Sequence, residues 1–112
     1  MKKFEIHYVN FKHNVAYDRK EYGDAHLQDT KPRPCVILST NQAVTTVAPL
    51  TSKNGKRLDL PYHLLVGEEL VLMEQVATVP TYVVDKKPFK KQFTDAQITE
   101  LQSQIVILFL AD

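Results

Sequence analysis

The sequence predicts a mainly β domain of the α+β type, a small barrel of strongly curved antiparallel strands with one amphipathic helix at the C-terminus. Short apolar segments rich in β-branched residues recur along most of the chain, separated by turn signals such as Asn54-Gly55. Near the C-terminus the apolar residues change to helical spacing. With 112 residues, no repeat and no linker, the chain is expected to form one domain over residues 1–112.

The N-terminal part predicts one strand and one long loop. Residues 4–11 alternate imperfectly between apolar and polar side chains, which predicts a strand whose single buried face carries Phe4, Ile6 and Tyr8. Residues 13–31 lack periodicity and are rich in charged residues, so we expect a loop with a helical turn around residues 17–22. A loop of this length in so small a domain is usually functional or disordered.

The middle of the chain predicts a succession of strands. Residues 34–40 are almost continuously apolar, which is typical of a strand buried on both faces. Asn41 and Gln42 predict a tight turn into a partner strand over residues 43–50. Further strands are expected over residues 60–66, 70–79 and 82–84, with a turn at residues 67–69 and a lysine-rich loop after residue 84.

The C-terminal segment predicts a helix with a defined start. Thr94 and Gln97 form a capping box, and Asp95 in the first turn favours the helix dipole. A stripe at helical spacing follows, and Phe109 is expected to widen it: Ile98, Leu101, Ile105 and Leu108. The opposite side is apolar too, through Val106, Ile107 and Leu110. A helix apolar on nearly all sides predicts contact with a second copy of the chain.

Composition points to a cytoplasmic protein. The longest apolar run, residues 105–111, is far shorter than the roughly 20 residues of a membrane span, and no apolar signal core follows the N-terminus. The single cysteine, Cys35, excludes an internal disulfide and a cysteine-rich zinc site. The four histidines show no metal-binding spacing. Net charge is +1, so any nucleic-acid contact would depend on local basic clusters.

Arg33 and Thr51 stand at the ends of two successive predicted strands, and antiparallel pairing would bring these ends together. A permanently charged, planar guanidinium beside a hydroxyl is suited to bind a phosphodiester. Pro32 and Pro34 fix the backbone on both sides of Arg33. The alternatives are a salt bridge at a strand start for Arg33, and hydroxyls that bond their own backbone for Thr51 and Ser52.

Several motifs, in order, resemble the MazF/PemK toxins of type II toxin–antitoxin systems. Arg33-Pro34 leads into an apolar strand, and Thr51-Ser52 follows the next one. Residues 60–64 resemble the family's Leu-Pro-x-His stretch, and residues 72–79 its Leu-x-Glu-Gln-Ile-x-Thr-Ile strand. The resemblance runs from about Arg33 to the C-terminus. It implies a compact SH3-like barrel of the CcdB type with a C-terminal helix.

The resemblance implies a metal-independent, sequence-specific endoribonuclease toxin that cleaves single-stranded mRNA. The 2′-hydroxyl beside the scissile bond would attack the phosphorus, leaving a 2′,3′-cyclic phosphate. Arg33 would stabilise the charged phosphorane, and Thr51 would bond a non-bridging oxygen or align the 2′-hydroxyl. The family also implies no cofactor, a homodimer that binds RNA in its groove, and a cognate antitoxin. The alternative is a non-catalytic binder on the same fold, a degenerate toxin or a CcdB-like gyrase inhibitor.

Five further residues are candidates for supporting or RNA-binding roles: Ser52, Glu74, Lys31, Lys53 and His26. Glu74 lies within an apolar segment, so its carboxylate is either paired or a proton acceptor with a raised pKa. Some family members carry an acid at this position with a proposed base role. The basic residues and the histidine lie in expected loops, where an inert, solvated side chain is the plain alternative.

The sequence also departs from the family pattern. Lys31-Pro32 replaces the glycine that commonly precedes the Arg-Pro pair, Gly23-Asp24 lies within the long loop, and Ala77 replaces a common arginine. Arg33 and Thr51 remain in place. The departures therefore bear on the RNA sequence preference and on the level of activity.

Overall fold

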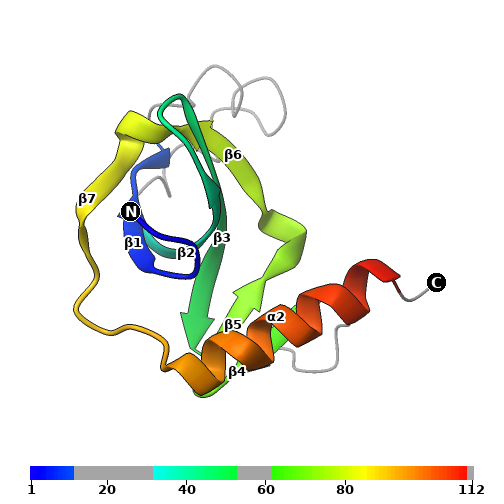
Figure 1. Ribbon diagram of the computed structural model, residues 1–112. Helices are drawn as coiled ribbons and strands as arrows, with labels where there is room; N and C mark the ends of the chain where they lie inside the picture. Colours follow the sequence, from blue (N-terminus) through cyan, green and yellow to red (C-terminus); the bar gives the residue numbers. More distant parts are fainter. Residues whose placement is uncertain (12–31, 53–61, 111–112) are drawn as a thin grey trace, which may run out of the picture.

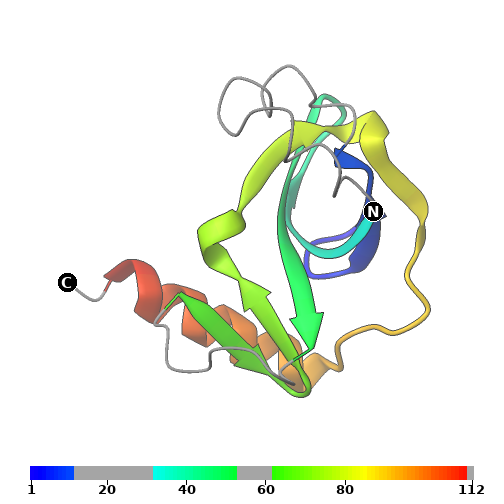
Figure 2. The same ribbon diagram turned by 180° about the vertical axis from the view of Figure 1, so that it is seen from behind.

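Seven antiparallel strands in one curled sheet and one long helix form the part of the chain that the computed structural model describes, residues 1–11, 32–52 and 62–110 (Figures 1 and 2). The mainly β prediction is confirmed, and the sheet curls without closing. The strands are β1 (Ile6–Val9), β2 (Arg33–Thr40), β3 (Val44–Ser52), β4 (His63–Val66), β5 (Glu69–Leu72), β6 (Ala77–Pro80) and β7 (Val84–Pro88). Their order is β4-β5-β3-β2-β1-β7, and β6 also pairs with β3.

The β2–β3 hairpin is the centre of the sheet. Its connection spans residues 41–43, where the Asn41 side chain accepts hydrogen bonds from the backbone N–H groups of Ala43 and Val44 at 2.8 and 2.9 Å. Cys35 and Val36 point to opposite faces and are both fully buried, which confirms the predicted burial on both faces. The second strand begins at Val44, one residue later than expected.

The two faces of this hairpin belong to different hydrophobic clusters. Val36 and Ala48 contribute to a cluster that includes Leu101 of the helix. Cys35, Ile37 and Val47 contribute to a second cluster, with residues from β1, β6 and β7. The hairpin therefore separates two small hydrophobic cores, and side-chain packing in both cores holds its strands in place.

The prediction of one continuous strand over residues 70–79 is wrong. β5 ends at Leu72, the 3₁₀ turn η3 (Met73–Gln75) follows, and β6 begins at Ala77. Both β5 and β6 pair with β3, β5 beyond Pro49 and β6 before it. The break lies beside Ala48 and Pro49, and Pro49 lacks the N–H that a continuous ladder requires. Glu74 therefore lies in an exposed turn and not within a strand.

β1 is buried on both faces, and the prediction of one buried face is wrong. Ile6 is buried on one face and His7 and Val9 on the other, whereas Tyr8 is exposed. The reason is position, because β1 lies between β2 and β7 and contacts both clusters.

The prediction for residues 82–84 also needs correction. The 3₁₀ turn η4 (Thr81–Val83) occupies most of this segment, and β7 begins at Val84. β7 runs on to Pro88 because it pairs with β1, so Lys86 and Lys87 lie in a strand and not in a loop.

Three sequence predictions fall outside the described residues: the loop over residues 13–31, its helical turn at residues 17–22, and the turn at Asn54-Gly55. The strand expected over residues 60–66 is described as β4 from His63 onward. Gly67 at its end has a φ of +61°, a conformation that favours glycine, and it lies in the predicted turn before β5.

Helix α2 (Asp95–Leu110) begins as predicted. The Thr94 N–H donates to the Gln97 side chain at 2.9 Å, and the Gln97 N–H donates to the Thr94 hydroxyl at 3.2 Å. Leu101 is fully buried, and the rest of the predicted stripe is half-buried. Phe109 is 72% exposed and does not widen the stripe, because the last turns extend beyond the sheet (Figure 1).

Candidate active site at the start of β2 and the end of β3

Arg33 and Thr51 lie at the same end of the β2–β3 hairpin. Arg33 is the first residue of β2, and Thr51 is next to last in β3. The ladder pairs Cys35 with Pro49, and the same register carried two residues further places Arg33 opposite Thr51. Opposite residues of an antiparallel pair share a face, and both side chains are half-buried. The structure thus places the two predicted residues at the same end of one hairpin.

The backbone of Arg33 lies at the start of a strand that is held from two sides. Val9 of β1 pairs with Arg33, and Tyr8 pairs with Pro34. The next residue, Cys35, pairs with β3 and donates its thiol to the Arg33 carbonyl at 3.6 Å. Arg33 therefore extends a long charged side chain from a backbone that pairs with β1, two residues before the first β2–β3 pair.

A chain of polar contacts leads from Arg33 to β4. The Arg33 Nη1 donates to the Gln75 Oε1 at 3.3 Å, and the Gln75 Nε2 donates to the Glu74 Oε1 at 3.2 Å. The other oxygen of Glu74 lies 3.0 Å from the His63 Nε2. Of the two alternatives for Glu74, the structure contains the paired one.

Gln75 and His63 were not among the predicted site residues. Both lie in motifs that the sequence displays, the Glu-Gln pair and the Pro-x-His stretch. Their contact with Arg33, direct or through Glu74, depends on the break between β5 and β6, which the periodicity of residues 70–79 does not predict.

Cys35, next to the site, is not a nucleophile at neutral pH. Burial raises the pKa of the Cys35 thiol to about 12, while the nearby positive charge of Arg33 lowers it to a smaller extent. The thiol stays protonated, and Cys35 serves the second hydrophobic cluster.

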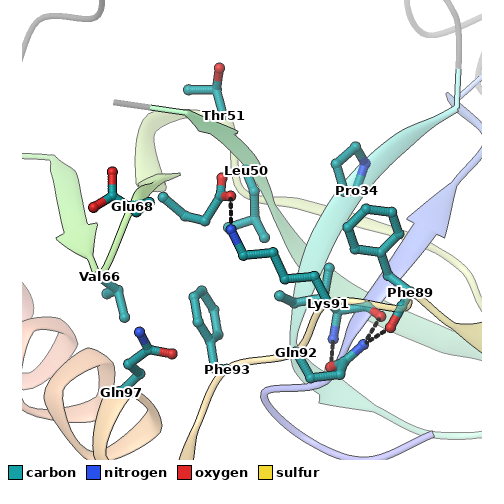
Figure 3. A pocket seen from close by; sticks show the side chains of 12 residues that line it. Pro34, Leu50, Thr51, Val66, Glu68, Phe89, Lys91, Gln92, Phe93 and Gln97 are labelled. Carbon is teal, nitrogen blue, oxygen red and sulfur yellow. Dashed lines mark hydrogen bonds and ion pairs between the residues drawn. The ribbon is translucent and has the colours of Figure 1, made fainter. Parts of the chain in front are cut away.

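A pocket of about 260 Å³ opens on the other face of the hairpin end (Figure 3). Its walls are mainly apolar and include Phe89 and Phe93, and an ion pair between Lys91 and Glu69 at 3.4 Å crosses it. Thr51 lies at its rim, with the hydroxyl turned away from Phe93. Arg33 is not part of its lining. The pocket and the Arg33 site therefore share the end of β3 but lie on different faces.

Three of the predicted supporting residues, Lys31, Lys53 and His26, lie outside the described residues. Ser52 ends β3, where its backbone pairs with Glu69. Within residues 1–11, 32–52 and 62–110, no three metal-type side chains form a group that could hold a metal ion. In that same part of the chain, no helix has both the length and the apolar character needed to cross a membrane.

Comparison with known protein families agrees with the resemblance that the sequence motifs carry. Residues 2–109 match the model of the PemK-like, MazF-like toxins of type II toxin–antitoxin systems. No curated protein matches the sequence. The family match covers nearly the whole chain, including β1 and the segment before Arg33 that carried no recognisable motif. The chain therefore belongs to the PemK-like, MazF-like toxins of type II toxin–antitoxin systems.

Proposed function

We propose that this toxin is a metal-independent, sequence-specific endoribonuclease that cleaves single-stranded RNA, chiefly mRNA. The proposal is supported by the position of Arg33 and Thr51 at the same end of the β2–β3 hairpin, in a chain of this toxin family. The 2′-hydroxyl loses its proton as it attacks the neighbouring phosphorus, the bond to the 5′ oxygen breaks, and that oxygen gains a proton, so no net proton is consumed. The products are a 2′,3′-cyclic phosphate and a 5′-hydroxyl end.

Arg33 supplies charge to this reaction. The pentacoordinate phosphorane carries more negative charge than the ground-state diester, and a fixed cation stabilises it selectively. A guanidinium does not lose its proton at ordinary pH, so Arg33 acts through charge and hydrogen bonds and not as a base. Its planar fork presents two N–H groups to two oxygens of one phosphate.

Thr51 supplies a neutral donor beside that charge. Its hydroxyl donates to a non-bridging oxygen, or accepts from the 2′-hydroxyl and aligns it for attack. Both roles require only a short, half-buried side chain at a fixed place, which the end of β3 provides through its pairing with β5. Ser52 has the supporting role of a second hydroxyl for the same phosphate.

The assembly that we propose is a homodimer whose groove binds RNA, inhibited by a cognate antitoxin that occupies the groove. Support comes from α2, whose last turns carry a surface of apolar side chains that the described chain does not cover. The exposed fractions are 54% for Val106, 64% for Ile107, 72% for Phe109 and 76% for Leu110. A surface of this kind is typical of an interface.

The substrate class is tested with matched oligonucleotides in excess EDTA. Single-stranded RNA should be cleaved at defined sites, whereas DNA of the same sequence should stay intact because it lacks the 2′-hydroxyl. RNA with a single 2′-deoxy substitution at the cleaved nucleotide should resist cleavage at that site alone. Cleavage of the DNA strand, or loss of all activity in EDTA, would contradict the proposal. RNA binding without cleavage would favour the non-catalytic binder.

A further inference from the structure

The polar chain from Arg33 to His63 joins three separate segments, β2, η3 and β4. We propose that Gln75 is a positioning residue that orients the guanidinium of Arg33, and that Glu74 and His63 hold Gln75 in place. This inference rests on the proposed function, because it assigns these residues to the same reaction. In this proposal Glu74 supports Gln75 and transfers no proton during the reaction.

The neutral side chain of Gln75 is suited to position the guanidinium of Arg33. Arg33 donates from Nη1 to a neutral amide oxygen at 3.3 Å, which fixes the fork without cancelling its charge. One of five N–H donors is used in this contact, and a guanidinium has donors on its other edges for a phosphate. A carboxylate in the place of Gln75 would form an ion pair with Arg33 and compete with RNA phosphate. A neutral partner is the choice that orients a cation and keeps it available.

The carboxylate of Glu74 has a partner on each oxygen. Oε1 accepts from Gln75, and Oε2 lies 3.0 Å from the His63 ring nitrogen. This pairing turns the Gln75 amide so that its own oxygen faces Arg33. A general base needs an oxygen directed at the 2′-hydroxyl, and Glu74 directs both of its oxygens at side chains of this chain.

His63 is the fixed end of this series of polar contacts. Its side chain is only 13% exposed, and its ring packs edge-on against Tyr62 with the ring centroids 5.1 Å apart. It begins β4, whose ladder pairs it with Leu72, the last residue before η3. Gln75, Glu74 and His63 thus lie at the open end of the β4–β5 hairpin. This arrangement places η3 beside the start of β2.

Kinetics of single variants test the proposal. Gln75→Ala should lower kcat about tenfold while KM for RNA changes less than about twofold, because orientation is lost but the charge remains. Gln75→Glu should raise KM instead, because the new carboxylate neutralises Arg33. The matched control is Gln102→Ala, an exposed glutamine of α2, which should behave as the parent. An unchanged kcat for Gln75→Ala would overturn the proposal.

Two variants of Glu74 distinguish a role in holding Gln75 in place from a role as a general base. Glu74→Gln keeps an oxygen for Gln75 and a polar partner for His63, so it should retain at least about half of the parental kcat. Glu74→Ala removes both contacts, so its kcat should fall toward the kcat of Gln75→Ala. If Glu74→Gln is as inactive as Glu74→Ala, Glu74 acts as a base and the proposed role is wrong. In an Arg33→Ala background, Gln75→Ala should cause no further loss.

A measurement without RNA separates this inference from the proposed function. The Arg33 Nε–Hε signal in NMR spectra should report an immobilised guanidinium in the parent and a mobile one in Gln75→Ala, with Gln102→Ala again unchanged. Equal mobility in all three proteins would overturn the positioning role even if RNA is cleaved. An immobilised Arg33 in a protein that cleaves no RNA would leave the contact standing, contradict the proposed function, and overturn the catalytic purpose assigned to the chain.

Discussion

At the scale of single residues, the site depends on a side chain that cannot change its charge. Arg33 is half-buried and is absent from both hydrophobic clusters, so its removal takes away charge and little packing. The motif around it was visible in the sequence because proline, arginine and threonine stand at recognisable strand ends. Gln75 and His63 were not assigned a role, since no local sequence pattern shows that η3 lies beside the start of β2.

Arg33→Ala should lower the rate of RNA cleavage by roughly two to three decades, a loss of about 2–4 kcal/mol of transition-state stabilisation. Arg33→Lys should recover only part of the rate, because an ammonium lacks the planar fork. Both are measured by single-turnover cleavage, with circular dichroism to confirm the fold. The control is Lys3→Ala, an exposed lysine near the N-terminus. Parental rates for Arg33→Ala would remove Arg33 from the mechanism.

Cys35 should be unreactive in the folded protein. Its thiol is fully buried and its pKa is raised to about 12, so almost no thiolate forms at pH 8. An alkylating reagent should modify Cys35 only after denaturation. The raised folded-state pKa stabilises the fold fully below the ordinary thiol pKa of 9.0, and this contribution is lost as pH rises toward 12. Rapid labelling of the native protein at pH 8 would contradict the burial.

At the scale of elements, the helix was predictable in its start and the sheet in its central hairpin. Thr94 and Gln97 form a local motif whose geometry depends on four residues alone, and both of its hydrogen bonds are present. The split of residues 70–79 was not predictable in this way. It results from β3 pairing with two strands in turn around Pro49, which is a tertiary effect.

Thr94→Ala should reduce the free energy of unfolding by about 1 kcal/mol, because the N–H of Gln97 loses its capping oxygen. Thermal denaturation should show a decrease in Tm of about 4 °C. Thr99→Ala is the matched control, since Thr99 lies within the helix and alanine is a better helix former. Equal Tm values for Thr94→Ala and the parent would show that α2 does not depend on its cap.

At the scale of the whole molecule, α2 has more apolar surface than the described sheet covers. It packs on β4, where the Gln104 side chain also donates to the Leu65 carbonyl at 2.9 Å. Its last turns extend past the sheet with their apolar side chains exposed (Figures 1 and 2). The sequence predicted this surplus correctly for Val106, Ile107 and Leu110, and wrongly placed Phe109 on the buried side.

Ile107→Glu should give a soluble monomer with reduced RNA cleavage, because it places a charge in the proposed dimer interface. The mass of the particle is measured by light scattering at micromolar concentration. Gln102→Glu, at an exposed polar position of the same helix, should leave the dimer intact. A well-folded monomer for the unmutated chain under these conditions would refute the dimer.

We propose that Arg33 and Thr51 promote attack by the 2′-hydroxyl without a metal ion. The most direct measurement is mass spectrometry of the RNA fragments formed in excess EDTA by the unmutated protein and by Arg33→Ala. The unmutated protein should give fragments that end in a 2′,3′-cyclic phosphate, paired with 5′-hydroxyl ends, and Arg33→Ala should give almost none. Fragments with a 3′-hydroxyl and a 5′-phosphate, or the same yield from Arg33→Ala, would contradict it.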